Sequence, residues 1–106
     1  MVGKTAYICS RYRAEKTAQF EDQLAYTKKM ARDAVMQGFD VIVPHLYYPL
    51  FLSDDDEAER ELGMNSALNL ILVCNVLLVC EKYGISSGMK AEIEFAEKMG
   101  IRIERV

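Results

Sequence analysis

Four short apolar runs alternate along the chain with longer segments whose apolar residues recur at helical spacing. Residues 6–9 and 40–43 have the composition of strands, and Pro44 ends the second of them. Val76–Cys80 is apolar throughout, which is typical of a strand covered on both faces. Residues 101–104 alternate between apolar and charged side chains, and this pattern predicts an edge strand with one exposed face.

The first of three predicted helical segments lies between the first two strands. Its apolar stripe is made of Phe20, Leu24, Ala31 and Val35. Acidic residues at its start and basic residues toward its end suit the helix dipole, and Gly38 predicts where it stops.

The second helical segment opens with Ser53 and Asp56, a spacing like that of a capping box. It continues to Ile71, and an interruption would fall near Gly63. The third helical segment covers residues 88–99 and leads into the last strand.

Strands that alternate with helices predict a parallel sheet with helices on both faces. We therefore expect residues 1–106 to form a single α/β domain. Its expected architecture is a flavodoxin-like (Rossmann-like) three-layer sandwich with a parallel sheet of about four to five strands. Ligands of such sheets bind at the carboxyl ends of the strands, where the strand order reverses. The loops on that side are residues 10–16, 44–53 and 81–88.

Composition narrows the classes of function. With 106 residues, 51% of them apolar, the chain has room for one packed core. A net charge of −3 argues against a nucleic-acid polymer as partner, because binding its phosphates needs a clustered basic face. The apolar run over residues 68–80 is too short, and too broken by Asn69 and Asn75, to span a bilayer. We expect no membrane partner.

The three cysteines form no C-x-x-C pair and lie inside apolar runs, so we expect buried, reduced thiols. A single histidine without paired ligand spacing makes a zinc site unexpected. The opening residues lead directly into the first predicted strand, so we expect no secretory signal. The predicted location is the cytoplasm.

Glu92 stands out because it falls on the apolar side of the third helical segment. At about 100° per residue, five apolar side chains form one stripe: Met89, Ile93, Phe95, Ala96 and Met99. A carboxylate inside such a stripe costs free energy unless it is paired or opens into a cavity. Near the carboxyl end of a strand, it suits a covalent nucleophile or a general base. The alternatives are a glutamate favoured by the helix dipole, or one paired with an arginine such as Arg60.

Ser86, Ser87 and Gly88 join the third strand to the third helical segment. Their hydroxyl and backbone N–H groups, at the positive end of a helix, suit a phosphate or a carboxylate. A Ser86 that only caps the helix explains the same residues.

Two other loops lie at the same predicted edge. The Ser-Arg-Tyr-Arg sequence at residues 10–13 brings two cations and a hydroxyl, although a solvated loop explains it equally well. His45, Tyr47 and Tyr48 follow the second strand, where aromatic rings either stack on a base or cover the end of the sheet. We base the prediction of a site on the convergence of these loops at one edge.

Three motifs along this edge carry a resemblance: Tyr7-Ile8-Cys9-Ser10-x-Tyr12-Arg13, Pro44-His45-Leu46-Tyr47 and Ser86-x-Gly88-Met89-x-x-Glu92-Ile93-x-x-Ala96. Together they resemble the nucleoside 2-deoxyribosyltransferase-like superfamily, and more narrowly a small group of bacterial and phage proteins within it. The resemblance extends from Tyr7 to Ile103, and the third motif is its most specific part.

The resemblance implies a flavodoxin-like fold and chemistry at the N-glycosidic bond of a nucleoside or a nucleoside 5′-monophosphate, by cleavage or by deoxyribosyl transfer. Glu92 matches the nucleophile that attacks the anomeric carbon and forms a covalent sugar–enzyme intermediate. Tyr7 matches a tyrosine that touches the sugar or that nucleophile. Ser10, Ser86 and Gly88 match residues that hold the 5′ end of the ligand.

The catalytic candidates are therefore Glu92 and Tyr7. The substrate-binding candidates come from the loops at the carboxyl edge: Ser10, Tyr12, Arg13, His45, Tyr47, Ser86, Ser87, Gly88 and Met89. The chemistry implies no metal and no organic cofactor. Because members of the superfamily complete their pocket with residues of a neighbouring subunit, the resemblance also implies a homodimer or a larger homo-oligomer.

The chain departs from the pattern of the superfamily at three positions. An aspartate expected two turns before the third strand aligns near Ala67, with Asn65 and Asn69 nearby. An aspartate expected at the start of that strand is Asn75, and the proline after the first strand is Arg11. Because a second carboxylate would stabilise an oxocarbenium-like transition state, these changes affect the expected catalysis more than the expected binding.

Three hypotheses follow from the sequence. The first is an N-glycosidase or deoxyribosyltransferase with Glu92 as nucleophile and water or a second base as acceptor. The second is a nucleotide-binding or sequestering module that has lost the chemistry. The third is a structural or interaction protein in which Glu92 is a buried, paired residue.

Overall fold

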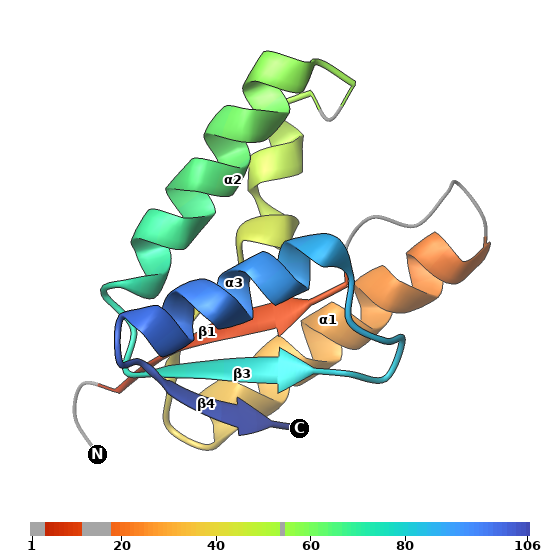
Figure 1. Cartoon of the computed structure of the whole chain (residues 1–106). Helices are drawn as coiled ribbons and strands as arrows, with labels where there is room; N and C mark the ends of the chain where they lie inside the picture. Colours follow the sequence, from red (N-terminus) through yellow and green to blue (C-terminus); the bar gives the residue numbers. More distant parts are fainter. Residues whose placement is uncertain (1–3, 12–17, 54) are drawn as a thin grey trace.

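A computed structural model describes residues 4–11, 18–53 and 55–106. Figure 1 shows a twisted sheet between helices. Four parallel strands make the sheet, in the order β2-β1-β3-β4: β1 (Thr5–Ser10), β2 (Asp40–Ile42), β3 (Val76–Cys80) and β4 (Arg102–Arg105). Three α-helices and two short 3₁₀ helices connect them: α1 (Ala18–Met36), η1 (Pro44–Leu46), η2 (Tyr48–Leu50), α2 (Glu57–Ile71) and α3 (Ser87–Lys98). The predicted α/β class and parallel sheet are confirmed.

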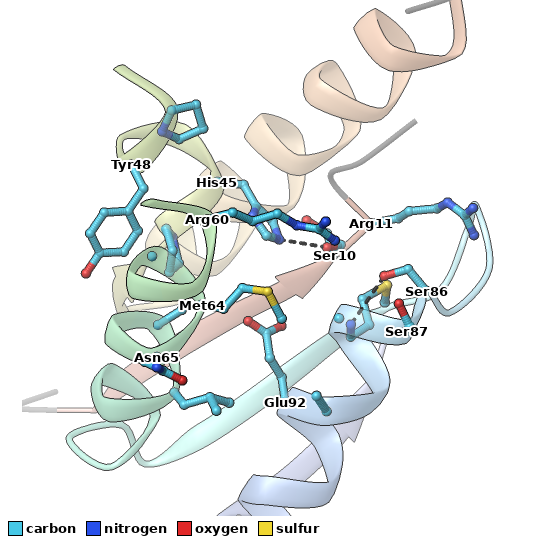
Figure 2. A pocket seen from close by; sticks show the side chains of 18 of the residues that line it. Ser10, Arg11, His45, Tyr48, Arg60, Met64, Asn65, Ser86, Ser87 and Glu92 are labelled. Atoms are coloured by element: carbon cyan, nitrogen blue, oxygen red, sulfur yellow. Dashed lines mark hydrogen bonds between the residues drawn. The ribbon is translucent and has the colours of Figure 1, made fainter. Parts of the chain in front are cut away.

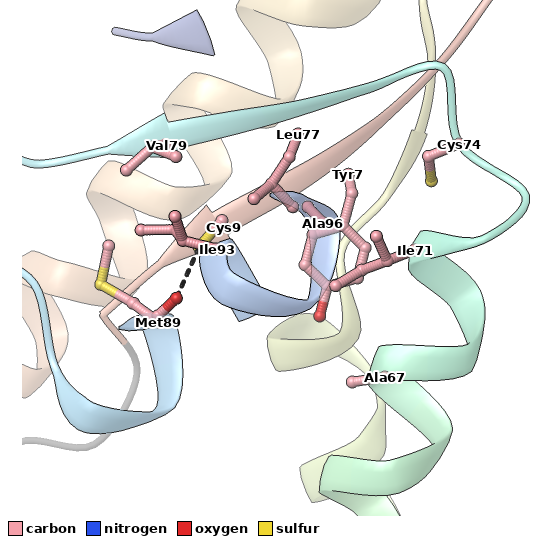
Figure 3. Close-up of a cluster of buried hydrophobic side chains, with 10 residues drawn as sticks. All are labelled: Tyr7, Cys9, Ala67, Ile71, Cys74, Leu77, Val79, Met89, Ile93 and Ala96. Carbon is pink, nitrogen blue, oxygen red and sulfur yellow. Dashed lines mark hydrogen bonds between the residues drawn. The ribbon is translucent and has the colours of Figure 1, made fainter. Parts of the chain in front are cut away.

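The helices cover the two faces of the sheet and make the three predicted layers. Tyr7 and Cys9 of β1 point to the face that α2 and α3 cover, in the apolar cluster of Figure 3. Ala6 and Ile8 point the other way, into a second cluster with α1. This alternation follows from the two-residue period of a strand, and it buries both faces of the central strands β1 and β3.

The strand order reverses at β1, which pairs with β2 on one side and with β3 on the other. Connections from β1 and β3 therefore leave the carboxyl edge in opposite directions and open a crevice there. The segments that follow β1, β2 and β3 meet at this edge, as the pattern predicted.

Some boundaries differ from those predicted. β4 is one residue later in the chain than expected. α2 runs unbroken through Gly63, and its N-cap is Asp56, whose side chain accepts a hydrogen bond from the Glu59 N–H. Ser53 instead donates its own N–H to the Glu59 carboxylate, so the capping interactions begin three residues later than the sequence indicated.

The predicted apolar stripe of α1 is correct at Ala31, which is buried, and wrong at Val35. Val35 is 51% exposed, and the buried residues of the helix are Gln23, Thr27, Ala31 and Ala34. Small and polar residues face the sheet because Ser10, at the end of β1, points to this side and bonds to α1. A pattern read from apolar residues alone misses such a polar contact.

Within the described residues, no helix is both long and apolar enough to cross a membrane.

Candidate active site

Glu92 reaches the site because of where α3 begins. The Ser86 side chain accepts a hydrogen bond from the Met89 N–H and caps the helix, so α3 starts beside the carboxyl end of β3. Glu92 then follows in the second turn, on the face that also carries Met89, Ile93 and Ala96. Its side chain is buried, as the apolar stripe predicted, with 7% of its surface exposed.

The two oxygens of the Glu92 carboxyl have different surroundings. The phenol of Tyr7, from the neighbouring strand β1, donates a hydrogen bond to Oε2. Oε1 is buried and makes no hydrogen bond within the described residues. No ion pair within the described part of the chain involves Glu92, so the alternative of a carboxylate paired with Arg60 is not what the structure contains. Tyr7 thus holds one oxygen in place, whereas the other has no hydrogen-bond partner among the described residues.

Burial has the largest effect on the pKa of the Glu92 carboxyl. It raises the pKa of Glu92 from 4.5 to about 7, although the Tyr7 phenol and the Cys9 thiol act in the opposite direction. Burial and the neighbouring Glu92 also raise the pKa of both Tyr7 and Cys9 above the ordinary range of their groups. At neutral pH, Tyr7 is therefore a hydrogen-bond donor, and Glu92 is present in comparable amounts as acid and as carboxylate.

A cavity of about 560 Å³ opens over Glu92. Its volume lies within the range of about 300–1,000 Å³ that is common for small-molecule sites. The floor is Glu92 and Met89 of α3, one wall is α2, and the other walls are the segments after β1, β2 and β3. Figure 2 shows the Glu92 carboxyl pointing toward α2, with the Met64 side chain extending toward it.

Ser10 and His45 lie together at the end of β1. Ser10 lines the cavity, but its hydroxyl is turned to the α1 side, 2.8 Å from the hydroxyl of Thr27. The Thr27 hydroxyl donates to the Gln23 carbonyl, so Ser10 is the donor in this pair. His45 Nε2 lies 3.0 Å from the Ser10 carbonyl oxygen, which fixes the imidazole at the cavity wall.

The candidates at the start of α3 all line the cavity: Ser86, Ser87, Gly88 and Met89. Ser86 does act as an N-cap, so its side-chain oxygen already accepts the Met89 N–H. Ser87 is exposed and Gly88 is half-buried, and both are in the first turn, where backbone N–H groups have no partner within the helix.

The remaining candidates differ in position. Tyr12 and Arg13 lie outside the described residues. Tyr47 does not line the cavity. Its ring packs 4.7 Å from that of Tyr48, and Tyr48 is the aromatic residue of the cavity wall. The sequence predicted the correct edge for both tyrosines, but the candidate that it selected was Tyr47, whereas the residue that lines the cavity is Tyr48.

α2 contributes cavity-lining residues that are absent from the candidate set, among them Arg60, Met64 and Leu68. They recur at a spacing of four residues, which places them on one side of the helix. This spacing is visible in the sequence, but only the tertiary structure tells that this side faces a ligand pocket.

Two of the three departures from the superfamily pattern involve asparagines, and these lie at opposite ends of the domain. Asn65 lines the cavity. Asn75 lies at the opposite, amino end of the sheet, where its side-chain oxygen accepts the Thr5 N–H at 2.7 Å and joins β1 to β3. The other carboxylate that lines the cavity is Glu59, which is engaged with the Ser53 N–H.

No group of three or more His, Cys, Asp or Glu side chains within the described residues is arranged to hold a metal ion. All three cysteines are free and buried, as predicted.

Comparisons with known proteins place the fold and the family. The fold matches that of a 2-deoxyribosyltransferase from Bacillus psychrosaccharolyticus with a TM-score of 0.76 and 15% identity, over 95% of this chain and 70% of that one. A 2-deoxyribosyltransferase from Leishmania mexicana matches with a TM-score of 0.68 and 13% identity, over 97% of this chain and 63% of that one. The architecture is therefore that of the nucleoside 2-deoxyribosyltransferase-like, flavodoxin-like proteins.

In sequence, residues 4–106 match the family described as a domain of unknown function, DUF7768, and the chain belongs to that family. Comparison with curated proteins gives no match.

Proposed function

We propose that the protein acts on the N-glycosidic bond of a nucleoside or a nucleoside 5′-monophosphate, with Glu92 as the nucleophile. The observation that carries this proposal is the asymmetry of the Glu92 carboxyl. Tyr7 holds Oε2, whereas Oε1 is buried without a partner at the floor of a ligand-sized cavity. The fold of the 2-deoxyribosyltransferases supports the same class of substrate.

The proposed reaction has two steps. Oε1 of the ionised carboxyl attacks the anomeric carbon of the sugar, and the C–N bond to the base breaks. Its electron pair leaves with the base, which takes up a proton from solvent. Water or a second base then attacks the same carbon and releases the Glu92 carboxylate, so the sugar is either hydrolysed or transferred.

Tyr7 has two roles in this proposal. Its hydrogen bond keeps the carboxyl in one rotamer, and it lowers the pKa of Glu92 relative to burial alone. Because a protonated carboxyl is a poor nucleophile, the bond increases the reactive fraction at neutral pH.

A second candidate function is nucleotide binding without turnover. The observation in its favour is Asn65, an amide at the cavity wall near the position where the resemblance predicts an aspartate. Without a second carboxylate to stabilise positive charge on the sugar, the pocket would bind the ligand and leave its glycosidic bond intact.

Incubation with a panel of nucleosides and 5′-monophosphates separates the two functions. Free base is followed by chromatography and binding by thermal shift. We expect base release by the wild type and none by Glu92→Gln, with Glu94→Gln, on the exposed side of the same helix, as the matched control. Full turnover by Glu92→Gln would disprove the mechanism, and stabilisation without base release would favour the binding module.

The finer expectations stay predictions: the small bacterial and phage group, the homo-oligomer and the cytoplasmic location.

A further inference from the structure

β4 leaves one side of the sheet open to a further strand. It is the outermost strand next to β3 (Figure 1), and within the described residues no strand pairs with its outer side. The other edge strand, β2, has only three residues and is closely followed by Pro44. A short strand beside a proline is a protected edge, whereas residues 101–106 contain neither proline nor glycine. β4 is therefore the edge that can accept another strand.

The bonds between β4 and β3 tell which backbone groups of β4 face outward. The Val106 N–H donates to the Val79 carbonyl at 2.9 Å, so Val106 turns its backbone groups toward β3. Neighbouring residues of a strand turn these groups to opposite sides, so Ile103 and Arg105 present their N–H and C=O groups to the outer side. A strand added at this edge would pair with these two residues.

The side chains of β4 divide between the two faces of the sheet. Arg102 and Glu104 lie on the face that carries α1, where they line a groove beside Ile8 and Leu78. Arg102 Nη2 is 3.4 Å from Glu104 Oε2, and the two side chains are 68% and 40% exposed. Ile103 points to the opposite face and packs, half-buried, against the cluster that α2 and α3 cover. The edge thus carries a cation, an apolar residue and an anion in succession.

This succession is complementary to itself in one register. In an antiparallel pair of β4 strands with Ile103 on the two-fold axis, Ile103 meets its own copy, and Arg102 of each chain meets Glu104 of the other. An axis at Glu104 would instead place two Glu104 side chains opposite each other, and like charges there destabilise the pair. Charged edges usually prevent pairing between copies, but here the outward backbone groups and the charges favour the same register.

We propose that two copies of this chain associate through their β4 edges, antiparallel and with Ile103 on the two-fold axis, so that the two four-stranded sheets become one continuous sheet. None of the residues of β4 lines the cavity over Glu92, so the interface lies away from the candidate active site. It therefore differs from the oligomer that the resemblance implies, in which a neighbouring subunit completes the pocket. The inference does not depend on the proposed function.

Exchange of the two charges tests this interface by sedimentation equilibrium. The variants are Arg102→Glu, Glu104→Arg and the double variant that carries both changes. Each single variant brings like charges together across the axis, whereas the double variant restores opposite charges with their signs exchanged. Arg32→Glu, at an exposed position of α1 outside both the edge and the groove, is the matched control.

We expect the wild type to form a dimer in equilibrium with the monomer. Each single variant should weaken the dimer about tenfold or more, and the double variant and Arg32→Glu should associate as the wild type does. An equimolar mixture of the two single variants should form a heterodimer, because an edge with two acidic residues then faces an edge with two basic ones. The double variant and the mixture keep the test valid if a single variant folds less well.

Three results would overturn the proposal. The first is a wild type that stays monomeric at every concentration. The second is a dimer that neither single variant weakens, because another surface would then hold it. The third is a dimer that is lost in the single variants and is restored neither in the double variant nor in the mixture. The assays of base release and ligand binding test the proposed function separately, so either proposal can fail without the other.

Discussion

Burial of the Glu92 carboxyl makes the stability of the protein depend on pH, and Glu92→Gln removes this dependence. Glutamine has nearly the same shape and is neutral at every pH. Its amide oxygen can still accept the Tyr7 hydrogen bond that Glu92 Oε2 accepts. The variant thus isolates the free energy of placing a charge in this buried position.

The magnitude follows from the pKa. Burial raises the pKa of Glu92 from 4.5 to about 7, so the folded protein holds this proton more tightly than the unfolded chain does. The associated stability is fully present below pH 4.5 and is lost as the pH rises through 7. At about 1.4 kcal/mol per pKa unit, the loss reaches about 3 kcal/mol at pH 8.

The assay is urea denaturation of the wild type and Glu92→Gln at several pH values from 5 to 8, followed by circular dichroism. We expect the free energy of unfolding of the variant to exceed that of the wild type by about 2.5 kcal/mol more at pH 8 than at pH 5. In thermal melts of a domain of this size, the same change is roughly 10–15 °C. Glu94→Gln, at an exposed position of α3, serves as the control.

The change of this difference with pH is the decisive quantity. An unsatisfied glutamine N–H in the cavity would lower stability by about 1–3 kcal/mol, but by the same amount at every pH. If the difference between the two proteins were constant from pH 5 to 8, Glu92 would not be a buried acid with a raised pKa.

Three further outcomes are expected. The rate of base release should rise with pH through about 7, because the reactive form of Glu92 is the carboxylate, and a rate that falls over this interval would contradict the nucleophilic role. Tyr7→Phe should move the midpoint of that pH–rate profile to higher pH, because the phenol lowers the pKa of Glu92, and should lower the rate at pH 7 by about tenfold. An unchanged pH–rate profile would exclude the positioning role of Tyr7. Asn75→Ala should lower the free energy of unfolding, measured by urea denaturation, by about 1 kcal/mol, because the hydrogen bond to the Thr5 N–H is lost. Ligand affinity in a titration should stay the same, and weakened binding would mean that Asn75 influences the pocket.

Periodicity in the sequence determined the α/β class and the approximate position of each element. Val76–Cys80 is a strand over the predicted residues because an unbroken apolar run of that length can be buried on both faces only in a central strand. Glu92 was identifiable for a related reason. A helix that buries one stripe must bury any charged residue inside it, and this one is 7% exposed.

Contacts between segments far apart in the chain could not be predicted from the pattern of apolar and polar residues within one element. The inward face of α1 was misassigned in part because Thr27 faces the sheet and contacts the Ser10 hydroxyl. No residue near Thr27 in the sequence indicates that partner. Tyr48 rather than Tyr47 lines the cavity because of how η1 and η2 turn the chain after β2.

The sequence by itself determined which side chains had to be buried and which loops would follow the strands. Only the tertiary structure decided what meets at the carboxyl edge. Tyr7 and Glu92 are 85 residues apart, and Arg60 reaches the same cavity from a third segment. Their convergence depends on the strand order and on the packing of α2 beside α3. Both of these arise from burying apolar faces over the whole domain, whereas a local pattern records only the face of its own element.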